Sequence, residues 1–408
     1  MSHKIVITEL PEASFPREHD TMGHTDRRIR VSCLISEHRL LEARCERTDQ
    51  SSGLGNIYVG RVEKIVKNLQ AAFIEIAPGV ACYYPMNAGR APVFVKKLPS
   101  KDLVQGDELL VQIERESVKT KAPTVTTNLN LSGRYVVLTT EKKRIGLSSK
   151  LDRENRERLQ ELIRTHYHGE YGLIVRTNAG DVPEEELLSE IEMLTEKMTE
   201  LVSKASTRTC FSCVYRAMPK YMSYLQNSYQ QEVDEIVTDL PEVYENISEY
   251  RRQYPAFANI PVRLYEDCLL PLGKLYNLER EFTRALSKNV WLKSGGYLVI
   301  EPTEALTVID VNTGKSVAKK EPQKHFRKIN LEAAEEIALQ MRLRNLSGIV
   351  IIDFIDLDSK EDQNEVLDCL RRATRRDPVP VQVLDMTKLN LVEVTRKKIE
   401  KTLKEQLT

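Results

Sequence analysis

Two aspartates each close an apolar, β-prone stretch of the sequence. Asp310 ends the stretch 306–310 and Asp353 ends the stretch 349–353. A helix-forming segment lies between them, which predicts two parallel strands joined by a right-handed crossover. The carboxyl ends of parallel strands meet at one edge of a sheet, where open α/β folds build their sites. We therefore expect the carboxylates of Asp310 and Asp353 to lie side by side.

Two neighbouring carboxylates repel each other unless a cation joins them or one of them takes up a proton. Mg²⁺ suits this arrangement because it prefers oxygen ligands and is often held by one or two carboxylates with waters and phosphates. Asn312 lies two residues beyond Asp310 and can orient a water or a phosphate oxygen from the same side. The pattern predicts a Mg²⁺ site; the alternative is that each aspartate caps a turn after its strand. We interpret Asp356 and Asp358 as solvated loop charges.

Other familiar motifs do not compete with this one. The tripeptide 314–316 reads Gly-Lys-Ser, but a phosphate-binding loop needs a glycine five residues before that Gly, and position 309 is isoleucine. The sequence contains neither a dinucleotide-binding Gly-x-Gly-x-x-Gly nor a His-Glu-x-x-His zinc motif. The aspartate pair is therefore the strongest chemical signal.

The composition limits the class of protein. The chain has 408 residues, enough for two to four domains, and 60 basic residues balance 60 acidic ones, so a nucleic-acid site must come from local clustering. Seven cysteines are an odd number and suit a reducing compartment better than a disulfide framework. The sequence has no apolar run long enough for a membrane span and no signal-peptide core. We expect a soluble, cytoplasmic protein of several domains.

The secondary structure predicted from the sequence changes several times along the chain. Residues 1–50 predict strands, and residues 56–140 predict a small all-β barrel of the OB type, because short Val-, Ile- and Tyr-rich runs alternate with turn signals. Helices are expected at 151–166 and 183–204 around a strand at 172–176, and mostly polar helix at 222–262. The expected strands before residue 140 are 4–8, 28–36, 39–47, 57–65, 71–76, 81–85, 108–115, 124–131 and 135–138.

The C-terminal third predicts a sheet with crossover helices. A helix is expected at 277–292, and Asn330 is expected to cap a second helix that ends at Arg344. A third helix is expected at 360–376. The expected strands are 297–300, 306–310, 348–352 and 379–384.

Three long motifs in this region resemble the ribonuclease E/G family. They occupy residues 295–312, 330–344 and 348–356, and the resemblance extends from about residue 30 to 400. It implies a Mg²⁺-dependent endoribonuclease that cleaves single-stranded RNA, leaves 5′-phosphate products, prefers 5′-monophosphorylated RNA and serves RNA processing and decay. The alternative is a non-catalytic RNA-binding protein on the same scaffold.

The resemblance also implies a multidomain α/β fold. A ribonuclease-H-like subdomain carries an inserted OB-fold barrel and a sensor of the RNA 5′ end, and a deoxyribonuclease-I-like α/β catalytic domain follows. The implied segments are 1–50 and 222–285 for the ribonuclease-H-like part, 51–126 for the barrel, 127–221 for the sensor and 286–408 for the catalytic domain.

Residue roles are carried over from the same resemblance. Asp310 and Asp353 match the catalytic, Mg²⁺-binding carboxylates, and Asn312 matches the asparagine that supports them. The RNA-binding residues would be Phe73, Tyr83 and Lys121, and the 5′-monophosphate would be bound by Arg176 and Thr177. From the residues alone, we would favour the interpretation that Phe73 belongs to the barrel core. Arg176 and Thr177 alone would be a weak signal, because strand ends often carry these residue types. The basic residues counted near the barrel are Arg61, Lys64, Lys67, Lys96, Lys97 and Lys121.

The family's dimer commonly depends on a zinc site built from paired cysteines after the catalytic domain. No cysteine follows Cys369, and the close pair Cys210 and Cys213 lies before that domain. The pair supplies half of a four-thiolate site, and in a β-run over 209–214 the two thiols would point to opposite faces. We expect a monomer or a weak homodimer without a zinc link.

Overall fold

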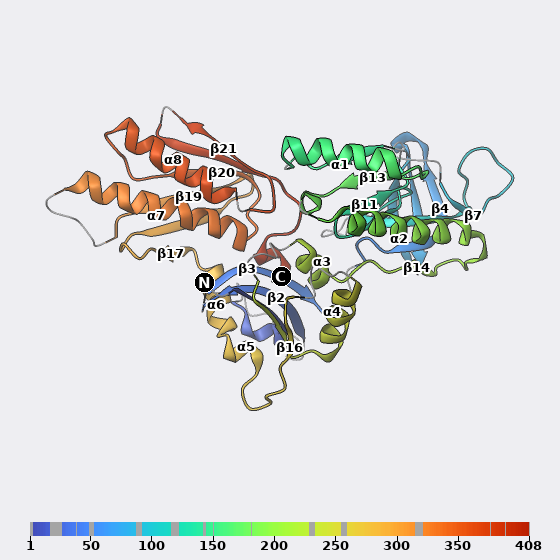
Figure 1. Ribbon diagram of the computed structural model, residues 1–408, viewed down its shortest axis with the longest axis horizontal. Coiled ribbons are helices and arrows are strands. Elements are labelled where there is room, and N and C mark those ends of the chain that lie inside the picture. The colour runs from blue at the N-terminus through green and yellow to red at the C-terminus, as the bar shows by residue number, and fades with distance from the viewer. Residues whose placement is uncertain are drawn as a thin grey trace. The chain divides into compact units, whose positions relative to one another are not determined.

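The computed structural model describes residues 3–16, 27–37, 39–48, 53–86, 92–115, 122–141, 144–149, 151–180, 182–227, 233–253, 259–314, 321–375, 377–387 and 389–407. The chain divides into two compact units. The first joins Met1–Ser51 to Lys220–Thr408, and the second is the continuous segment Ser52–Pro219. Figure 1 shows the arrangement of the elements within each unit. No helix among the described residues is long and apolar enough to cross a membrane.

The first sheet of the first unit has the order β16-β15-β1-β2-β3. Strands β1, β2 and β3 form an antiparallel meander, while β15 and β16 run parallel to β1. The strands are β1 (His3–Pro11), β2 (Arg28–Ser36), β3 (Arg39–Arg47), β15 (Glu235–Thr238) and β16 (Val262–Leu264). The helices of this part are α3 (Lys220–Asn227), α4 (Pro241–Gln253), α5 (Leu272–Leu275) and α6 (Leu278–Leu286), and α9 (Leu403–Leu407) packs on β3.

The expectation of mostly polar helix over 222–262 holds for α3 and α4 but not between and after them, where β15 lies and β16 begins. The strand β15 is only four residues long and its flanks are acidic and polar. Its pairing with β1 joins segments about 230 residues apart in the chain, as in the register pair Lys4 with Glu235. Local periodicity contains no information about such a distant partner.

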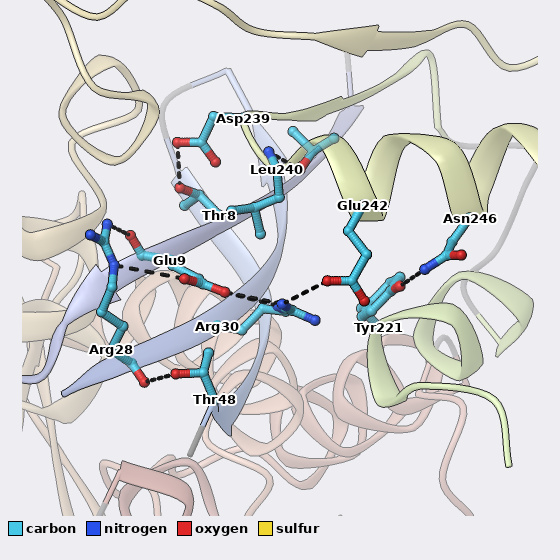
Figure 2. A network of polar contacts seen from close by, with 11 residues as sticks. Thr8, Glu9, Arg28, Arg30, Thr48, Tyr221, Asp239, Leu240, Glu242 and Asn246 are labelled. Atoms are coloured by element: carbon cyan, nitrogen blue, oxygen red, sulfur yellow. Dashed lines mark hydrogen bonds and ion pairs between the residues drawn. The ribbon is translucent and has the colours of Figure 1, made fainter. Parts of the chain in front are cut away.

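A network of polar side chains connects β1 and β2 to the helices beside them (Figure 2). Thr8 Oγ1 donates to Asp239 Oδ2 at 2.9 Å, and burial raises the pKa of this aspartate. Glu9 accepts from Arg30 Nη2 at 3.0 Å, and the Arg30 guanidinium lies 5.5 Å from the centre of the Tyr221 ring. The network thus joins the two strands to α3 through side chains whose charges are largely paired.

The second sheet of the first unit has the order β17-β18-β19-β20-β22-β21. Its buried face packs against α7 and α8, which lie on the same side of the sheet (Figure 1). The strands are β17 (Asn289–Trp291), β18 (Tyr297–Pro302), β19 (Leu306–Asn312), β20 (Gly348–Asp353), β21 (Val381–Met386) and β22 (Leu391–Arg396). The helices are α7 (Pro322–Leu343) and α8 (Lys360–Thr374).

Two predictions in this sheet need correction. The helix expected over 277–292 ends at Leu286, since Ser287 adopts an extended backbone and Asn289–Trp291 pairs with β18 as an edge strand. Asn330 does not cap a helix, because α7 begins eight residues earlier, with Pro322 in its first turn. Strand β22 was not expected from the sequence.

The second unit contains a closed β-barrel in which β4 pairs with both β5 and β8. The barrel sheet is formed by β4 (Ile57–Val66), β5 (Ala71–Ala77), β6 (Val80–Pro85), β7 (Phe94–Lys96), β8 (Glu108–Arg115), β9 (Thr124–Thr126) and β14 (Cys213–Tyr215). Closure removes the free edges of the central strands and agrees with the OB-like barrel expected from the sequence.

A smaller sheet of the same unit has the order β10-β11-β13-β12. It is built from β10 (Asn130–Ser132), β11 (Val136–Thr139), β12 (Ile145–Leu147) and β13 (Gly172–Val175), and packs against α1 (Arg153–His166) and α2 (Glu184–Ser203). The single strand expected over 124–131 is therefore wrong: it is split between two sheets. The strand expected at 135–138 also belongs to this sheet rather than to the barrel.

Candidate functional site

The predicted pair of aspartates is brought together by the strand register. Strands β19 and β20 are parallel neighbours, and Asp310 lies directly opposite Asp353 at their carboxyl ends. The residues beside them in each strand, Ile309 and Ile352, are fully buried against α7 and α8. Because side chains alternate along a strand, both carboxylates lie on the opposite, open face of the sheet. The expectation that the two would be adjacent is confirmed.

The two carboxylates differ in their surroundings. Asn312 Nδ2 donates to Asp310 Oδ2 at 2.7 Å, so a neutral amide fixes the orientation of Asp310. Burial raises the pKa of Asp353, and the negative charges of Asp310 and Asp356 raise it further. Asp356, expected to be a solvated loop charge, is exposed but accepts from Asn390 Nδ2 at 3.1 Å. A cation at this edge would relieve the repulsion among these groups.

A buried asparagine on α7 fixes the backbone beyond Asp353. Asn330 Nδ2 donates to the carbonyl oxygen of Ile355 at 2.7 Å, and Asn330 Oδ1 accepts from the Ile355 N–H at 3.1 Å. The residue is fully buried, so these bonds satisfy polar atoms that would otherwise be costly to bury. The sequence contained one indication of this positioning role: Asn330 is an amide residue within the apolar stripe of a helix.

The donor set fits a hard cation such as Mg²⁺. The nearest donors are carboxylate and amide oxygens, which Mg²⁺ prefers, whereas zinc sites usually offer sulfur or imidazole nitrogen. Among the residues that the structure describes, no group of three or more His, Cys, Asp or Glu side chains is placed to hold a metal ion. A Mg²⁺ ion held by Asp310 and Asp353 would therefore need waters or phosphate oxygens to complete its shell.

One row of side chains crosses the barrel. The register places Phe73 opposite Tyr83, with ring centres 6.2 Å apart at 72°, and extends the row in both directions. Both rings are half-buried, so Phe73 does not belong to the fully buried barrel core. In order across β4, β5, β6, β9 and β8, the residues of the row are Lys64, Phe73, Tyr83, Thr124 and Arg115. Two aromatic rings flanked by exposed cations are the composition of a surface that binds single-stranded nucleic acid.

The row adds a residue that sequence reasoning missed and removes two that it counted. Arg115 was not singled out, because only the pairing of β8 with β9 places it in the row. Arg61 is ion-paired with Glu75 at 3.1 Å, and Lys97 with the buried Asp107 at 2.6 Å. These two cations are therefore less available than their sequence positions suggested. Lys121 lies outside the described residues.

Arg176 and Thr177 follow directly after β13, at its carboxyl end. The Arg176 N–H donates to the carbonyl oxygen of Tyr135 at 2.7 Å, and Thr177 Oγ1 lies 2.8 Å from Ser148 Oγ. Arg156 Nη2 donates to the carbonyl oxygen of Ser148 at 3.0 Å. Arg176 is half-buried and Thr177 exposed. The Arg156 guanidinium and two hydroxyls thus lie near this strand end, which also carries Arg176, and arginine with hydroxyl groups is a combination that suits a phosphate.

A buried carboxylate on α2 holds the neighbouring loop. Glu190 accepts three backbone N–H bonds, from Arg134 at 2.8 Å, Tyr135 at 2.7 Å and Val136 at 2.9 Å. A Cβ atom on Gly133 would come within 2.4 Å of Glu190 Oε1, so any other residue there would displace the carboxylate that holds the loop. Glu190 thereby fixes the position of the Tyr135 carbonyl oxygen, which accepts a hydrogen bond from the Arg176 N–H. The sequence did not predict this role, because Glu190 lies on the apolar side of α2.

Cys210 and Cys213 do not share a strand. Strand β14 begins at Cys213, whose Sγ lies 3.3 Å from the carbonyl oxygen of Tyr215. Cys210 lies in a turn before it, and Phe211 has a φ of +69°. The β-run expected over 209–214 is therefore wrong, because the left-handed residue ends it. That Cys210 and Cys213 form no zinc link between two chains stays a prediction.

Comparisons with known proteins agree on one family. The family model described as "Ribonuclease E/G family" matches residues 130–399. Ribonuclease G of Salmonella typhimurium is 32% identical over 379 residues, which cover 90% of this chain and 77% of that protein. Ribonuclease G of Haemophilus influenzae is 31% identical over 95% of this chain and 80% of its own length. Ribonuclease E of Synechocystis is 34% identical over 85% of this chain and 52% of its own length.

Proposed function

The chain belongs to the ribonuclease E/G family, and from this premise we propose that it is a Mg²⁺-dependent endoribonuclease of single-stranded RNA. The observation that carries the proposal is the register pair Asp310 and Asp353, with Asn312 bonded to the first carboxylate. We place its work in RNA processing and decay in the cytoplasm, as a monomer or weak homodimer.

The reaction proposed is hydrolysis of a phosphodiester. Water attacks phosphorus, the bond from phosphorus to the 3′-oxygen breaks, and the downstream product keeps a 5′-phosphate. Asp310 and Asp353 would hold the Mg²⁺ ion, whose chemistry is Lewis-acid activation of the phosphodiester and of the attacking water. Asn312 keeps Asp310 oriented, and Asn330 keeps the end of β20 in place. The two neutral amides therefore position the site without adding charge.

The topology supports the finer fold assignment as a proposal. The first sheet has three antiparallel strands and two further strands that run parallel to the first of them. This is the order of a ribonuclease-H-like sheet, and we propose a ribonuclease-H-like subdomain for residues 1–50 and 222–285. The barrel suits an OB-fold module at residues 51–126. The smaller sheet suits a sensor of the RNA 5′ end at residues 127–221. The six-stranded sheet suits a deoxyribonuclease-I-like catalytic domain at 286–408.

The proposal is tested with a 5′-monophosphorylated oligonucleotide and Mg²⁺. Cleavage inside the strand with 5′-phosphate products supports it. Binding without cleavage under the same conditions would favour the alternative, a non-catalytic RNA-binding protein on the same scaffold. Chelation of Mg²⁺ should stop cleavage, and restoring the ion should restore it.

The barrel row gives a prediction about RNA affinity. Phe73→Ala and Tyr83→Ala should each weaken binding of single-stranded RNA by about tenfold, since stacking contributes on the order of 1–3 kcal/mol per base. Arg115→Ala should lower the slope of log affinity against log salt by about one, because it removes one phosphate contact. Filter binding at several salt concentrations measures both effects. Val80→Ala, which shortens an exposed side chain outside the row, is the control; an equal loss in this variant would contradict the assignment.

The strand end at Arg176 gives a prediction about the RNA 5′ end. Arg176→Ala combined with Thr177→Val should slow cleavage of 5′-monophosphate RNA by about tenfold and leave 5′-hydroxyl RNA nearly unchanged, because the hydrogen bonds form only to the phosphate. Paired cleavage assays on the two substrates check this. Equal slowing on both would mean that the two residues serve the fold alone.

A further inference from the structure

An exposed aromatic pair lies on the six-stranded sheet that carries Asp310 and Asp353. Trp291 of β17 is 70% exposed, and its ring centre lies 5.1 Å from that of the half-buried Tyr297 of β18, with the planes tilted by 46°. Trp291 is the only tryptophan of the chain. Large aromatic side chains are usually well buried, so an indole left mainly in water suggests that a ligand covers it.

The strand register connects this pair to the carboxylates. Trp291 lies opposite Tyr297, and Tyr297 lies opposite Asn312, so the three side chains form one row across β17, β18 and β19. Asn312 is bonded to Asp310, which places the row on the open face that carries the two aspartates. From strand spacing and rise, Tyr297 lies about 8 Å and Trp291 about 12 Å from Asp310 along the sheet.

The hairpin that carries Trp291 is held tightly against the site. Glu332 of α7 accepts from the backbone N–H groups of Lys293 at 2.5 Å and Ser294 at 2.9 Å. A Cβ atom on Gly296 would come within 2.7 Å of the Asn312 carbonyl oxygen, so the hairpin and β19 are in backbone contact. The backbone of the hairpin that carries the aromatic pair is therefore held in place beside Asn312.

We propose that Trp291 and Tyr297 form a stacking subsite for an unpaired base of the RNA, next to the phosphate held at Asp310 and Asp353. The proposal rests on the proposed function and names how that site positions its substrate. An unpaired base offers a π-face to the indole, and the exposed Lys293 beside the pair offers a cation to the adjoining backbone phosphate. An RNA strand is the favoured occupant because the row runs without a break into the carboxylate site.

The single tryptophan makes the subsite directly observable. Without Mg²⁺, so that the RNA stays intact, titration with a 5′-monophosphorylated oligonucleotide should quench the tryptophan fluorescence. A series of oligonucleotides with an abasic residue at each successive position then locates the stacked base. We expect the quench to be lost at one or two positions only, while fluorescence anisotropy of a labelled RNA shows binding at all of them.

Variants test the effect on cleavage. Trp291→Ala should lower kcat/KM about tenfold, mainly through KM, and Trp291→Phe should restore most of it, because a phenyl ring still stacks. Leu269→Ala removes an apolar side chain that is 96% exposed and should have no effect. Circular dichroism confirms that each variant is folded.

The outcomes separate this proposal from the proposed function. Quenching in Asp310→Asn, which keeps the base contact, supports the subsite even if the protein cleaves no RNA. Binding by anisotropy without any quench would overturn the subsite even if the protein cleaves RNA. A change of oligomeric state in Trp291→Ala with unchanged kcat/KM would assign the pair to contact with a second copy of the chain and overturn it as well.

Discussion

Asp310→Asn and Asp353→Asn should each lower the cleavage rate by on the order of a thousandfold, the scale seen when one preorganised electrostatic group is removed from a site. The register places the two carboxylates opposite each other, so each substitution removes one of the two negative charges that would hold the Mg²⁺ ion. RNA affinity should stay within about twofold, because the proposed stacking surfaces are unchanged. Single-turnover cleavage and filter binding measure the two quantities separately.

Asp358→Asn is the matched control for this prediction. It removes a carboxylate from the exposed loop that follows the same strand, without changing the register pair. Its cleavage rate should equal that of the unmodified protein. Near-normal Mg²⁺-dependent cleavage in either Asp310→Asn or Asp353→Asn would remove that residue from the mechanism.

The site at the strand ends was predictable because local patterns determine it. Apolar β-prone runs that end in Asp310 and Asp353, with a helix between them, specify parallel neighbours through the geometry of the crossover alone. The helices α1 and α2 were predictable for a similar reason, since their apolar stripes repeat along one face. Chain order also gives the neighbours of β18, β19 and β20, but not the edge of the sheet, where β22 lies between β20 and β21.

The features that were missed depend on partners distant in sequence. Strands β15 and β16 are short and lie between polar segments, and only pairing with β1 and with each other stabilises them. Arg115 joins the barrel row through β9, and Trp291 joins the face that carries Asp310 and Asp353 through β18. Within its own segment, none of these strands or residues shows a pattern that indicates its distant partner. Register is therefore the information that the sequence pattern lacks.

A buried ion pair at the other end of the six-stranded sheet gives the largest expected effect on stability. Arg396 Nε donates to Asp377 Oδ2 at 2.8 Å, and Arg396 Nη1 donates to Asn345 Oδ1 at 2.6 Å and to the Leu346 carbonyl oxygen at 3.1 Å. Arg396 is 3% exposed and Asp377 4%. The guanidinium thus joins the last residue of β22 to the segment that leads into β20.

Asp377→Asn should lower the free energy of unfolding of the first unit by about 3–5 kcal/mol, because it leaves the Arg396 charge buried without its counter-ion. Adding Arg396→Met should recover part of this loss, since the double variant buries no unpaired charge. Asp385→Asn is the control: it breaks the exposed ion pair with Arg371, and such surface pairs contribute only about 0–1 kcal/mol. Urea unfolding gives the energies, and hydrogen exchange separates β20 and β22 from the barrel strands. A loss in Asp377→Asn no larger than in Asp385→Asn would show that water reaches Arg396 and that the pair does not stabilise the sheet.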